Sequence, residues 1–426
     1  MERYSEYKDS GIYYIPLIPS SWNVLKGKIL FKEEKRPIRQ QDEIVTCFRD
    51  GQVTLRKNRR LEGFTNSLKE IGYKGIRKGD LVIHNMDAFA GAIGVSDSDG
   101  KGTPVYAVCT PIREDVNQYY YCFLLRFLAK IGFIQSLAKG IRERSTDFRY
   151  GDFKELLLPV PSRAEQDAIV RYLDAATSKI DKAIAMQQKM IDLLNERKQI
   201  IIQNAVTKGL DENVEMKDSG VEWIGMIPKH WEILKLKRCA SIKTGTTPPT
   251  NERKYFDGGR ISWFTPGDLN DLHLKFASKT ITQKAIDDKV GRLFPAKTIY
   301  FVGIGATVAK VSACDFAASS NQQINAIICN ESLDYIFATY VLKSEQEFIR
   351  NMANYVTLPI INQSDTGLID MIVPPKSEQQ AIVAYLGKEM QRFDSAISNC
   401  QRQITLLQER KQIIINEVVT GKVKVS

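Results

Sequence analysis

Two long stretches of the chain carry apolar residues at the spacing of an α-helix. In 165–207, isoleucine and leucine recur three, four and seven positions apart, and no Gly or Pro occurs from Ser162 to Thr207. The stretch 378–420 repeats the pattern, with Pro374 in front and Gly421 behind. This periodicity predicts two amphipathic helices. At 1.5 Å per residue each would be roughly 66 Å long, which is too long to lie on one small domain.

These helical stretches belong to a longer internal repeat. The sequence Leu-Leu-Asn-Glu-Arg-Lys-Gln-Ile-Ile-Ile begins at Leu193, and it recurs 213 residues later with Gln in place of Asn. Upstream, an Ile-Pro-x-x-Trp segment ends at Trp22 and recurs 209 residues later at Trp231. The chain therefore consists of two copies of one module of about 210 residues, a pattern that favours a repeat architecture.

The middles of the two modules differ and have a mixed α/β pattern. Short β-branched and aromatic runs bounded by turn residues predict strands at 81–83, 105–108, 298–302 and 324–328. Helical patterns follow at 119–139 and 333–354. We expect a mixed α/β fold of two globular domains joined by two long helices. Tandem copies related by a local two-fold axis would place these helices antiparallel, as in a coiled coil. Alternatively, each helix covers only the sheet of its own module.

The repeat also predicts where the domains begin and end. The expected parts are a first globular domain at 1–158, a central helical region at 159–210, a second globular domain at 211–370 and a C-terminal helical region at 371–426.

Composition narrows the possible functions. The formal net charge of +10 favours a polyanionic partner such as nucleic acid, although a merely basic surface would give the same number. The seven cysteines stand singly and the three histidines are far apart, so neither a metal site nor a disulfide framework is expected. The first residues do not resemble a signal peptide and no apolar run could span a membrane, which predicts a cytoplasmic protein.

Catalytic motifs are missing from the sequence. No phosphate-binding loop, amino-methyltransferase motif or nucleophile elbow is present. Gly303-Ile304-Gly305 follows a predicted strand but lacks the third glycine of a dinucleotide fingerprint, so we interpret it as a tight turn. We therefore expect neither an enzyme active site nor a bound cofactor in this chain.

Basic and amide side chains gather in loop-like stretches of both modules. Lys and Arg neutralise phosphates, Arg also reads guanine, and Asn or Gln reads adenine. A solvated charged face is the alternative for any single cluster, and the occurrence of clusters in both modules favours DNA binding. The candidate DNA-binding residues are Arg36, Lys57, Arg59, Arg60, Arg142, Arg144, Arg149, Lys243, Thr244, Arg253, Lys254, Asn321, Gln322 and Gln363.

The order and duplication of these motifs resemble the specificity subunit of Type I restriction-modification systems. The second module carries Ile227-Pro228-x-x-Trp231, Lys243-Thr244-Gly245-Thr246-Thr247-Pro248, Ser320-Asn321-Gln322-Gln323 and Pro374-Pro375-x-x-Glu378-Gln379. The first carries Gly79-Asp80-Leu81-Val82-Ile83, Thr103-Pro104-Val105-Tyr106 and Leu158-Pro159-x-Pro161 before Glu165-Gln166. One departure is that Lys32 to Pro37 stands where the second module has its Thr-Gly-Thr-Thr-Pro turn.

The resemblance implies a non-catalytic DNA-recognition subunit with two target recognition domains. It implies a double-stranded DNA target that is asymmetric and bipartite, with one half-site per domain and an unread spacer between them. The expected partners are two modification subunits, which use S-adenosylmethionine to methylate adenine N6, and two restriction subunits, which use ATP and magnesium.

The repeated helices offer the same face twice, which makes them the expected docking surface for the modification subunits. The candidate residues are Glu196, Arg197, Lys198, Glu409, Arg410 and Lys411. Salt bridges across the helical pair are an open alternative for these residues. Two other functions also remain open: an enzyme whose catalytic part has no familiar motif, and a non-catalytic two-domain coiled-coil scaffold for a non-DNA partner.

Overall fold

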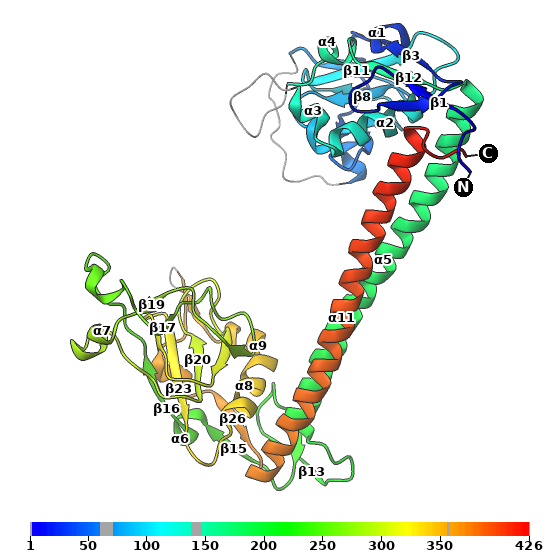
Figure 1. Ribbon diagram of the computed structural model, residues 1–426. Helices are drawn as coiled ribbons and strands as arrows, with labels where there is room; N and C mark the ends of the chain where they lie inside the picture. Colours follow the sequence, from blue (N-terminus) through cyan, green and yellow to red (C-terminus); the bar gives the residue numbers. More distant parts are fainter. Residues whose placement is uncertain (1, 60–70, 138–146, 356–357, 426) are drawn as a thin grey trace. The chain divides into compact units, whose positions relative to one another are not determined.

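The computed structural model describes residues 2–59, 71–137, 147–355 and 358–425 (Figure 1). The chain divides into two compact units, each composed of one globular domain and parts of two long helices. Unit 1 comprises Met1–Gln188 and Gln401–Ser426, and unit 2 comprises Lys189–Cys400. The long helices, α5 (Arg163–Lys208) and α11 (Lys376–Val419), contain 46 and 44 residues and contribute to both units.

Each domain contains a central antiparallel sheet. In unit 1 the strand order is β4-β11-β8-β9, and in unit 2 it is β16-β23-β20-β21-β18, with β18 parallel to β21. The central strands are β4 (Phe31–Glu33), β8 (Leu81–His84), β9 (Ile93–Val95), β11 (Tyr106–Pro111), β16 (Ala240–Thr244), β18 (His273–Leu274), β20 (Thr298–Val302), β21 (Val311–Cys314) and β23 (Ile324–Cys329). The order β4-β11-β8-β9 in unit 1 corresponds to β16-β23-β20-β21 in unit 2. The repeat therefore extends into the two domains, although their sequences differ.

Both faces of β8 and β20 are buried, which explains their almost continuous apolar sequences. In β20, Ile299 and Phe301 belong to the cluster that includes the long helices, whereas Tyr300 and Val302 point into a second cluster. In unit 1, Val82 of β8 lies in a different cluster from its neighbours on either side. The predicted strands are thus confirmed, with small shifts at their ends.

The remaining strands and short helices surround these sheets. In unit 1 they are β1 (Tyr7–Asp9), β2 (Leu17–Pro19), β3 (Asn23–Lys26), α1 (Gly27–Leu30), β5 (Val45–Cys47), β6 (Val53–Leu55), η1 (Arg56–Asn58), β7 (Lys74–Ile76), η2 (Ala88–Ala90), β10 (Gly100–Gly102), α4 (Tyr150–Phe153) and β12 (Leu157–Val160). In unit 2 they are β13 (Met216–Asp218), β14 (Met226–Pro228), β15 (Glu232–Lys235), α6 (Leu236–Cys239), η3 (Arg253–Tyr255), β17 (Ile261–Phe264), β19 (Thr280–Ile281), α7 (Gln283–Asp287), β22 (Ser319–Ser320), β24 (Asn354–Tyr355), β25 (Pro359–Ile360), α10 (Gln363–Gly367) and β26 (Asp370–Val373).

The helices that follow the sheets are shorter than the sequence predicted. The pattern at 119–139 forms α2 (Gln118–Lys130) and α3 (Phe133–Ser136), which are separated at Gly132, a glycine with φ of 78°. The pattern at 333–354 forms α8 (Tyr335–Ser344) and α9 (Gln346–Asn351). Apolar spacing alone did not reveal these breaks, and 138–139 lie outside the described residues.

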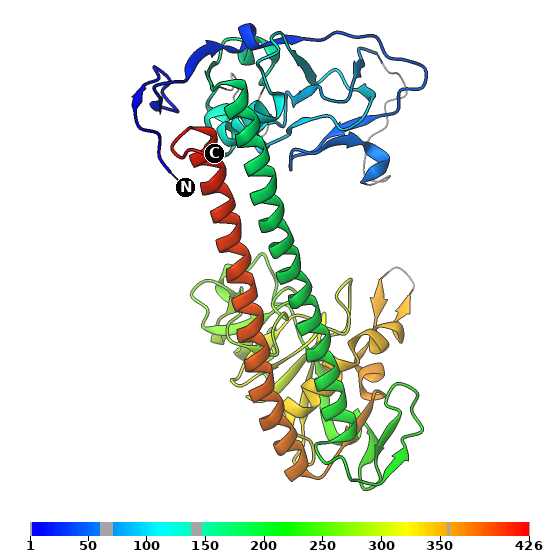
Figure 2. The same cartoon turned by 90° about the vertical axis from the view of Figure 1, so that its right-hand side faces the viewer.

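The long helices lie side by side in each unit (Figures 1 and 2). In unit 1 the start of α5 and the end of α11 share one core, through Ile169, Leu173, Val418 and Val419. In unit 2 the end of α5 and the start of α11 do the same. The helices are therefore antiparallel, as the repeat predicted. The start of each helix packs on the core of its own module, but its end packs on the core of the other module. The alternative that each helix covers only its own sheet is therefore wrong.

The repeated Ile-Pro-x-x-Trp and Glu-Gln motifs form one anchor in each unit. The buried Trp22 donates a hydrogen bond to Glu165 at the start of α5, with Nε1 3.2 Å from Oε1. Its counterpart Trp231 donates to Glu378 at the start of α11, with Nε1 2.9 Å from Oε2. The indole N–H is thereby satisfied although the ring is buried. The anchor fixes the first turn of each long helix to its domain.

The glutamine of each Glu-Gln pair completes the anchor. Gln379 is fully buried, and its Nε2 donates to the carbonyl oxygens of Ser332 and Pro374 at 2.9 and 2.7 Å. Its Oε1 accepts from the backbone N–H of Asp334, the residue that caps α8, at 2.7 Å. Gln166 makes the equivalent three bonds in unit 1, at 2.8, 2.9 and 3.0 Å. Each glutamine therefore ties a long helix to the helix that covers the sheet.

A glycine after each long helix lets the other helix reach the same anchor. A Cβ at Gly209, which follows α5, would lie 3.1 Å from Cζ2 of Trp231. At Gly421, beyond α11, it would lie 2.9 Å from Cη2 of Trp22. Both glycines have positive φ, at 78° and 73°, as expected at a helix C-terminus. Each tryptophan therefore contacts the start of one long helix and the end of the other.

Candidate nucleic-acid interface

Each domain has an open groove at the same place in its fold. The groove lies where the first sheet strand ends, beside the short helix that precedes the last strand of the domain. Groove 1, about 780 Å³, is lined by Glu33, Lys35, Lys74, Asn85, Met86, Pro104, Val105, Ala107, Asp147, Arg149, Tyr150 and Gly151. Groove 2, about 520 Å³, is lined by Lys243, Arg292, Leu293, Phe294, Pro295, Ile328 and Gln363.

The short helices at the two grooves have the same N-terminal structure. Tyr150 and Gln363 are the first residues of α4 and α10, and they occupy equivalent places in the repeat. Behind each stands an aspartate, Asp152 or Asp365, that accepts a hydrogen bond from the backbone N–H of the capping residue at 3.1 or 3.2 Å. The short helix and its aspartate are repeated, but the first side chain of the helix is a tyrosine in one unit and a glutamine in the other.

Groove 2 combines exposed cations with an amide. The Thr244 hydroxyl lies 2.9 Å from Oδ1 of the buried Asn325 and 3.3 Å from Oε1 of Gln363. Arg292 donates to the carbonyl oxygen of Thr244 at 2.6 Å, and the exposed Lys243 lies one residue earlier. The structure thus brings together three of the predicted DNA-binding residues, Lys243, Thr244 and Gln363. Arg292 and Asn325 were missed because no motif distinguishes them.

The loop containing Asn321 and Gln322 supports the edge of this groove. The backbone N–H of Thr246 donates to the carbonyl of Ser320 at 2.9 Å, and Thr247 hydrogen-bonds to the exposed Gln322. A Cβ at Gly245 would lie 2.3 Å from the Asn321 carbonyl oxygen, so only glycine permits this approach. Asn321 itself is buried, and its Nδ2 donates to Gln323 at 2.9 Å. In this conformation Asn321 shapes the loop, and Gln322 is the accessible amide.

Groove 1 carries cations and an aromatic ring. Lys35 is exposed where β4 ends, and Arg149 is 69% exposed although its Nε is 2.7 Å from Asp147. The Tyr150 hydroxyl donates to the carbonyl of Phe31 at 2.8 Å, which fixes the ring at the groove. Lys74 is bound to Glu33 at 2.9 Å. At the first residue of the short helix, groove 1 therefore presents a tyrosine ring where groove 2 presents an amide.

Arg36 is turned away from this groove. Its guanidinium lies 2.5 and 3.1 Å from the two oxygens of the buried Asp80, a bidentate pair. The hydrogen bond to Asp80 raises the pKa of Arg36. In this structure Arg36 holds the loop after β4, in the position that glycine and threonine occupy in unit 2.

Four other predicted DNA-binding residues, which lie in the described part of the chain, are not among those that line either groove. Lys57 is paired with Glu43 at 2.5 Å, and Arg59 is paired with Asp50 at 2.7 Å. On η3, Arg253 is exposed and Lys254 is bound to Glu252 at 2.5 Å. Three further candidates, Arg60, Arg142 and Arg144, lie outside the described residues.

The repeated polar residues of the long helices fall into two groups. Lys198 binds Asp394 at 2.5 Å in unit 2, and the equivalent Lys411 binds Asp181 at 2.7 Å in unit 1. These are symmetry-related salt bridges across the helical pair. Glu196, Arg197, Glu409 and Arg410 are exposed, and within the described part of the chain they form no ion pair. The open alternative is thus correct for the lysines, whereas the other four residues face outward.

An exposed apolar pair accompanies these outward residues on each helix, and the sequence analysis missed it. Leu193 and Ile200 are 49% and 41% exposed, and the equivalent Leu406 and Ile413 are 50% and 55% exposed. They stand three or four positions from the Glu-Arg pair and share its face of the helix. The signal was present in the sequence, because both apolar positions are identical in the two copies.

Three properties of the described residues concern metal binding, cysteine reactivity and membrane insertion. No cluster of three His, Cys, Asp or Glu residues is arranged to hold a metal ion there. Burial raises the pKa of Cys122 and Cys314 to about 11, so neither is a thiolate near neutral pH. Among these same residues, no helix has both the length and the apolar character that a membrane span needs.

Comparison with known proteins places this architecture. Residues 228–408 match the model of the Type I restriction modification DNA specificity domain. Over 439 aligned residues the chain is 24% identical to the putative type I restriction enzyme MjaX specificity subunit of Methanocaldococcus jannaschii, covering 95% of this chain and 97% of that one. The likeness thus extends over both modules. The chain is thus similar to type I specificity subunits over nearly its whole length.

Solved structures have the same fold as this chain. A chain from a structural study of complex assembly and conformational transition in the type I R-M system gives a TM-score of 0.77 at 18% identity, with 95% of this chain and 99% of that chain covered. The HsdS subunit from Thermoanaerobacter tengcongensis gives a TM-score of 0.54 at 16% identity, with 95% and 98% covered. The predicted mixed α/β fold with two domains is confirmed.

Proposed function

We propose that this chain is a type I specificity subunit and that it recognises double-stranded DNA at an asymmetric bipartite target, with one half-site read by each domain. We assign the two reading domains to 1–158 and 211–370, and the helical regions to 159–210 and 371–426. The observation that carries the proposal is the pair of equivalent grooves with unlike side chains. Lys35 and Arg149 stand at groove 1, whereas Lys243 and Gln363 stand at groove 2.

The side chains at the grooves suit the chemistry of base and phosphate recognition. Lysine and arginine pair with phosphates and release counterions, which gives affinity. The amides of Gln363 and Gln322 can bond adenine through its N6 and N7, while Arg149 can bond guanine through O6 and N7. Each domain would therefore favour different bases. If a local two-fold axis relates the two modules, as the repeat predicts, it would match the two-fold of the duplex backbone, and each reader would meet an equivalent strand.

We further propose that the subunit contributes recognition and no catalysis. In this proposal two modification subunits bring S-adenosylmethionine and methylate adenine N6, and two restriction subunits bring ATP and magnesium. This chain would then hold no cofactor of its own.

The proposed docking face for the modification subunits is the outward face of the long helices. On α5 it consists of Leu193, Glu196, Arg197 and Ile200. On α11 it consists of Leu406, Glu409, Arg410 and Ile413. An apolar pair flanking charged residues is a suitable anchor for a partner helix, because it offers both buried area and orientation. Lys198 and Lys411, which face the other long helix, would instead stabilise the pair.

The proposal is tested by sequencing the methylome of the host with and without this gene. In a host with active modification subunits, deletion should abolish one bipartite adenine-methylation motif and leave other motifs unchanged. Restoring the gene on a plasmid should restore that motif. An unchanged methylome in the deletion strain, with the modification subunits still expressed, would contradict the proposal.

A further inference from the structure

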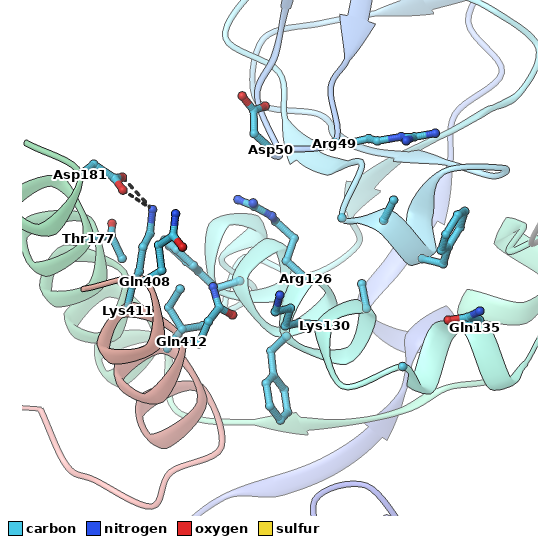
Figure 3. Close-up of a pocket in the computed structure, with 18 of the residues that line it drawn as sticks. Arg49, Asp50, Arg126, Lys130, Gln135, Thr177, Asp181, Gln408, Lys411 and Gln412 are labelled. Atoms are coloured by element: carbon cyan, nitrogen blue, oxygen red, sulfur yellow. Dashed lines mark hydrogen bonds and ion pairs between the residues drawn. The ribbon is translucent and has the colours of Figure 1, made fainter. Parts of the chain in front are cut away.

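Unit 1 contains a basic cavity between its domain and the long helices. The cavity, about 860 Å³, is bounded by α2 and the turn at Arg49 and Asp50 on one side, and by α5 and α11 on the other. Figure 3 shows Arg126 and Lys130 of α2 facing Gln408 and Gln412 of α11 across this space. Neither the reading grooves nor the anchor uses these residues.

Two cations in this cavity lack an anion. Arg126 and Lys130 form no salt bridge within the described part of the chain, and Nε of Arg126 is buried without a hydrogen-bond partner there. The acids that line the cavity are already occupied. Asp181 is bound to Lys411 at 2.7 Å, and Asp50 is bound to Arg59 at 2.7 Å. A buried donor without an acceptor costs free energy, so the arrangement favours an incoming anion.

The position of Arg126 depends on a glycine. A Cβ at Gly51 would lie 2.3 Å from Nη1 and 2.4 Å from Cζ of Arg126, so any side chain there would displace the guanidinium. Gly51 has φ of 89°, which also favours glycine. Only glycine at position 51 therefore allows Arg126 to occupy its observed position.

Unit 2 repeats the cation at the same position. Arg126 is the ninth residue after Asn117, which caps α2, and Lys343 is the ninth residue after Asp334, which caps α8. Arg126 shares its cavity with the Lys411–Asp181 pair, and Lys343 interacts electrostatically with Lys198 and Asp394, the equivalent pair. Burial, followed by the charge of Lys198, lowers the pKa of Lys343. Each module therefore places an additional cation near a lysine that is already paired.

We propose that the cavity at Arg126 and Lys130 receives a carboxylate side chain of a modification subunit, and that Lys343 marks the equivalent contact in unit 2. This inference rests on the proposed function. A partner present in two copies would meet a cation at the equivalent position of each module. A single small ligand would not explain the repetition. The duplex is disfavoured because its phosphates lie on a convex surface, whereas this cavity has walls on two sides.

The cavity is continuous with the proposed docking face. A neighbouring groove shares Lys130, Gln408 and Gln412 with the cavity and is also lined by Glu409 and Ile413. A partner helix that covers Ile413 would therefore lie next to Lys130. An acidic residue on that helix could reach Arg126, where a charge-assisted hydrogen bond in a partly desolvated site is stronger than one at the surface.

The test measures how tightly the modification subunit binds the full-length chain. The double variant Arg126→Gln/Lys130→Gln should raise the Kd by roughly tenfold to a hundredfold, because two charge-assisted bonds are lost. Arg126→Lys should restore part of the affinity. The matched control is Lys8→Gln/Lys78→Gln, which removes two exposed charges of unit 1 outside the cavity. Circular dichroism should show the same melting for all variants.

Carbodiimide cross-linking of the assembled complex identifies the partner group. This reagent joins an amine to a carboxylate in contact with it, so Lys130 should be found linked to an Asp or Glu of the modification subunit. A wild-type Kd in the double variant would overturn the inference, as would weaker DNA binding with unchanged assembly, which would identify a phosphate. A wild-type chain that binds neither modification subunits nor DNA would instead overturn the proposed function.

Discussion

The anchors and the grooves are related in opposite ways by the repeat. At the anchors, Trp22 and Trp231 donate equivalent indole hydrogen bonds to equivalent glutamates. At the grooves, the short helix begins with a tyrosine in one unit and a glutamine in the other, and in both units its third residue is an aspartate that accepts a hydrogen bond from the backbone N–H of the capping residue. The side chains that are the same in both modules thus fix the long helices to the domains. The side chains that differ between equivalent positions are the candidates for selecting bases.

The largest expected effect comes from breaking an anchor. Trp231→Ala removes a fully buried ring and leaves Glu378 without its indole donor, so the free energy of unfolding should fall by about 3–5 kcal/mol. Trp22→Ala should cost unit 1 a similar amount. Hydrogen exchange, read separately over each unit, measures both. Equal exchange in variant and wild type would show that the anchor does not carry the frame.

Replacing the buried glutamine of an anchor should lower the free energy of unfolding by a smaller amount. Gln379→Leu keeps the approximate size of the side chain but leaves three backbone groups without their partner. We expect a loss of about 3 kcal/mol in unit 2, since each unsatisfied buried group costs about 1–3 kcal/mol and some will rebind water. Urea unfolding followed by circular dichroism measures it, with Gln166→Leu as the matched variant. A change below about 0.5 kcal/mol would contradict the anchor.

The frame of the molecule could be predicted from the sequence, because its signals are periodic and duplicated. Apolar spacing predicted α5 and α11, and β-branched runs predicted β8 and β20. The break between α2 and α3 escaped prediction because Gly132 lies inside a pattern that otherwise continues. Element type follows from local pattern, whereas the precise ends depend on single residues and on tertiary packing.

The candidate site was less predictable, because charge pairing is a property of the fold. Arg36 looked available in the sequence, but the structure places Asp80 beside it. Arg292 stood in no cluster, yet it lines groove 2 and holds Thr244. A basic residue in a loop is therefore a weak guide until its acidic neighbours are known. Lys243 and Gln363, more than a hundred residues apart, were brought together only by the fold.

The smallest expected effect concerns the salt bridges between the long helices. Asp394→Asn removes the charge that binds Lys198, and Asp181→Asn removes the one that binds Lys411. Both aspartates are more than half exposed, so each change should cost about 0.2–1 kcal/mol. Thermal unfolding at low salt should show the loss, and 1 M NaCl should reduce the difference. A loss above about 2 kcal/mol would contradict this expectation and would show that the salt bridges contribute strongly to stability.

The most direct test of the central claim, that each domain reads its own half-site, is the methylome of two matched groove variants. Gln363→Ala should relax the bases of one half-site, and Arg149→Ala should relax the other, because each variant loses contacts worth about 1–3 kcal/mol of base discrimination. The unaltered half-site should remain unchanged in each case. If both variants relaxed the same half-site, or if neither changed the motif while methylation continued, the account would be contradicted.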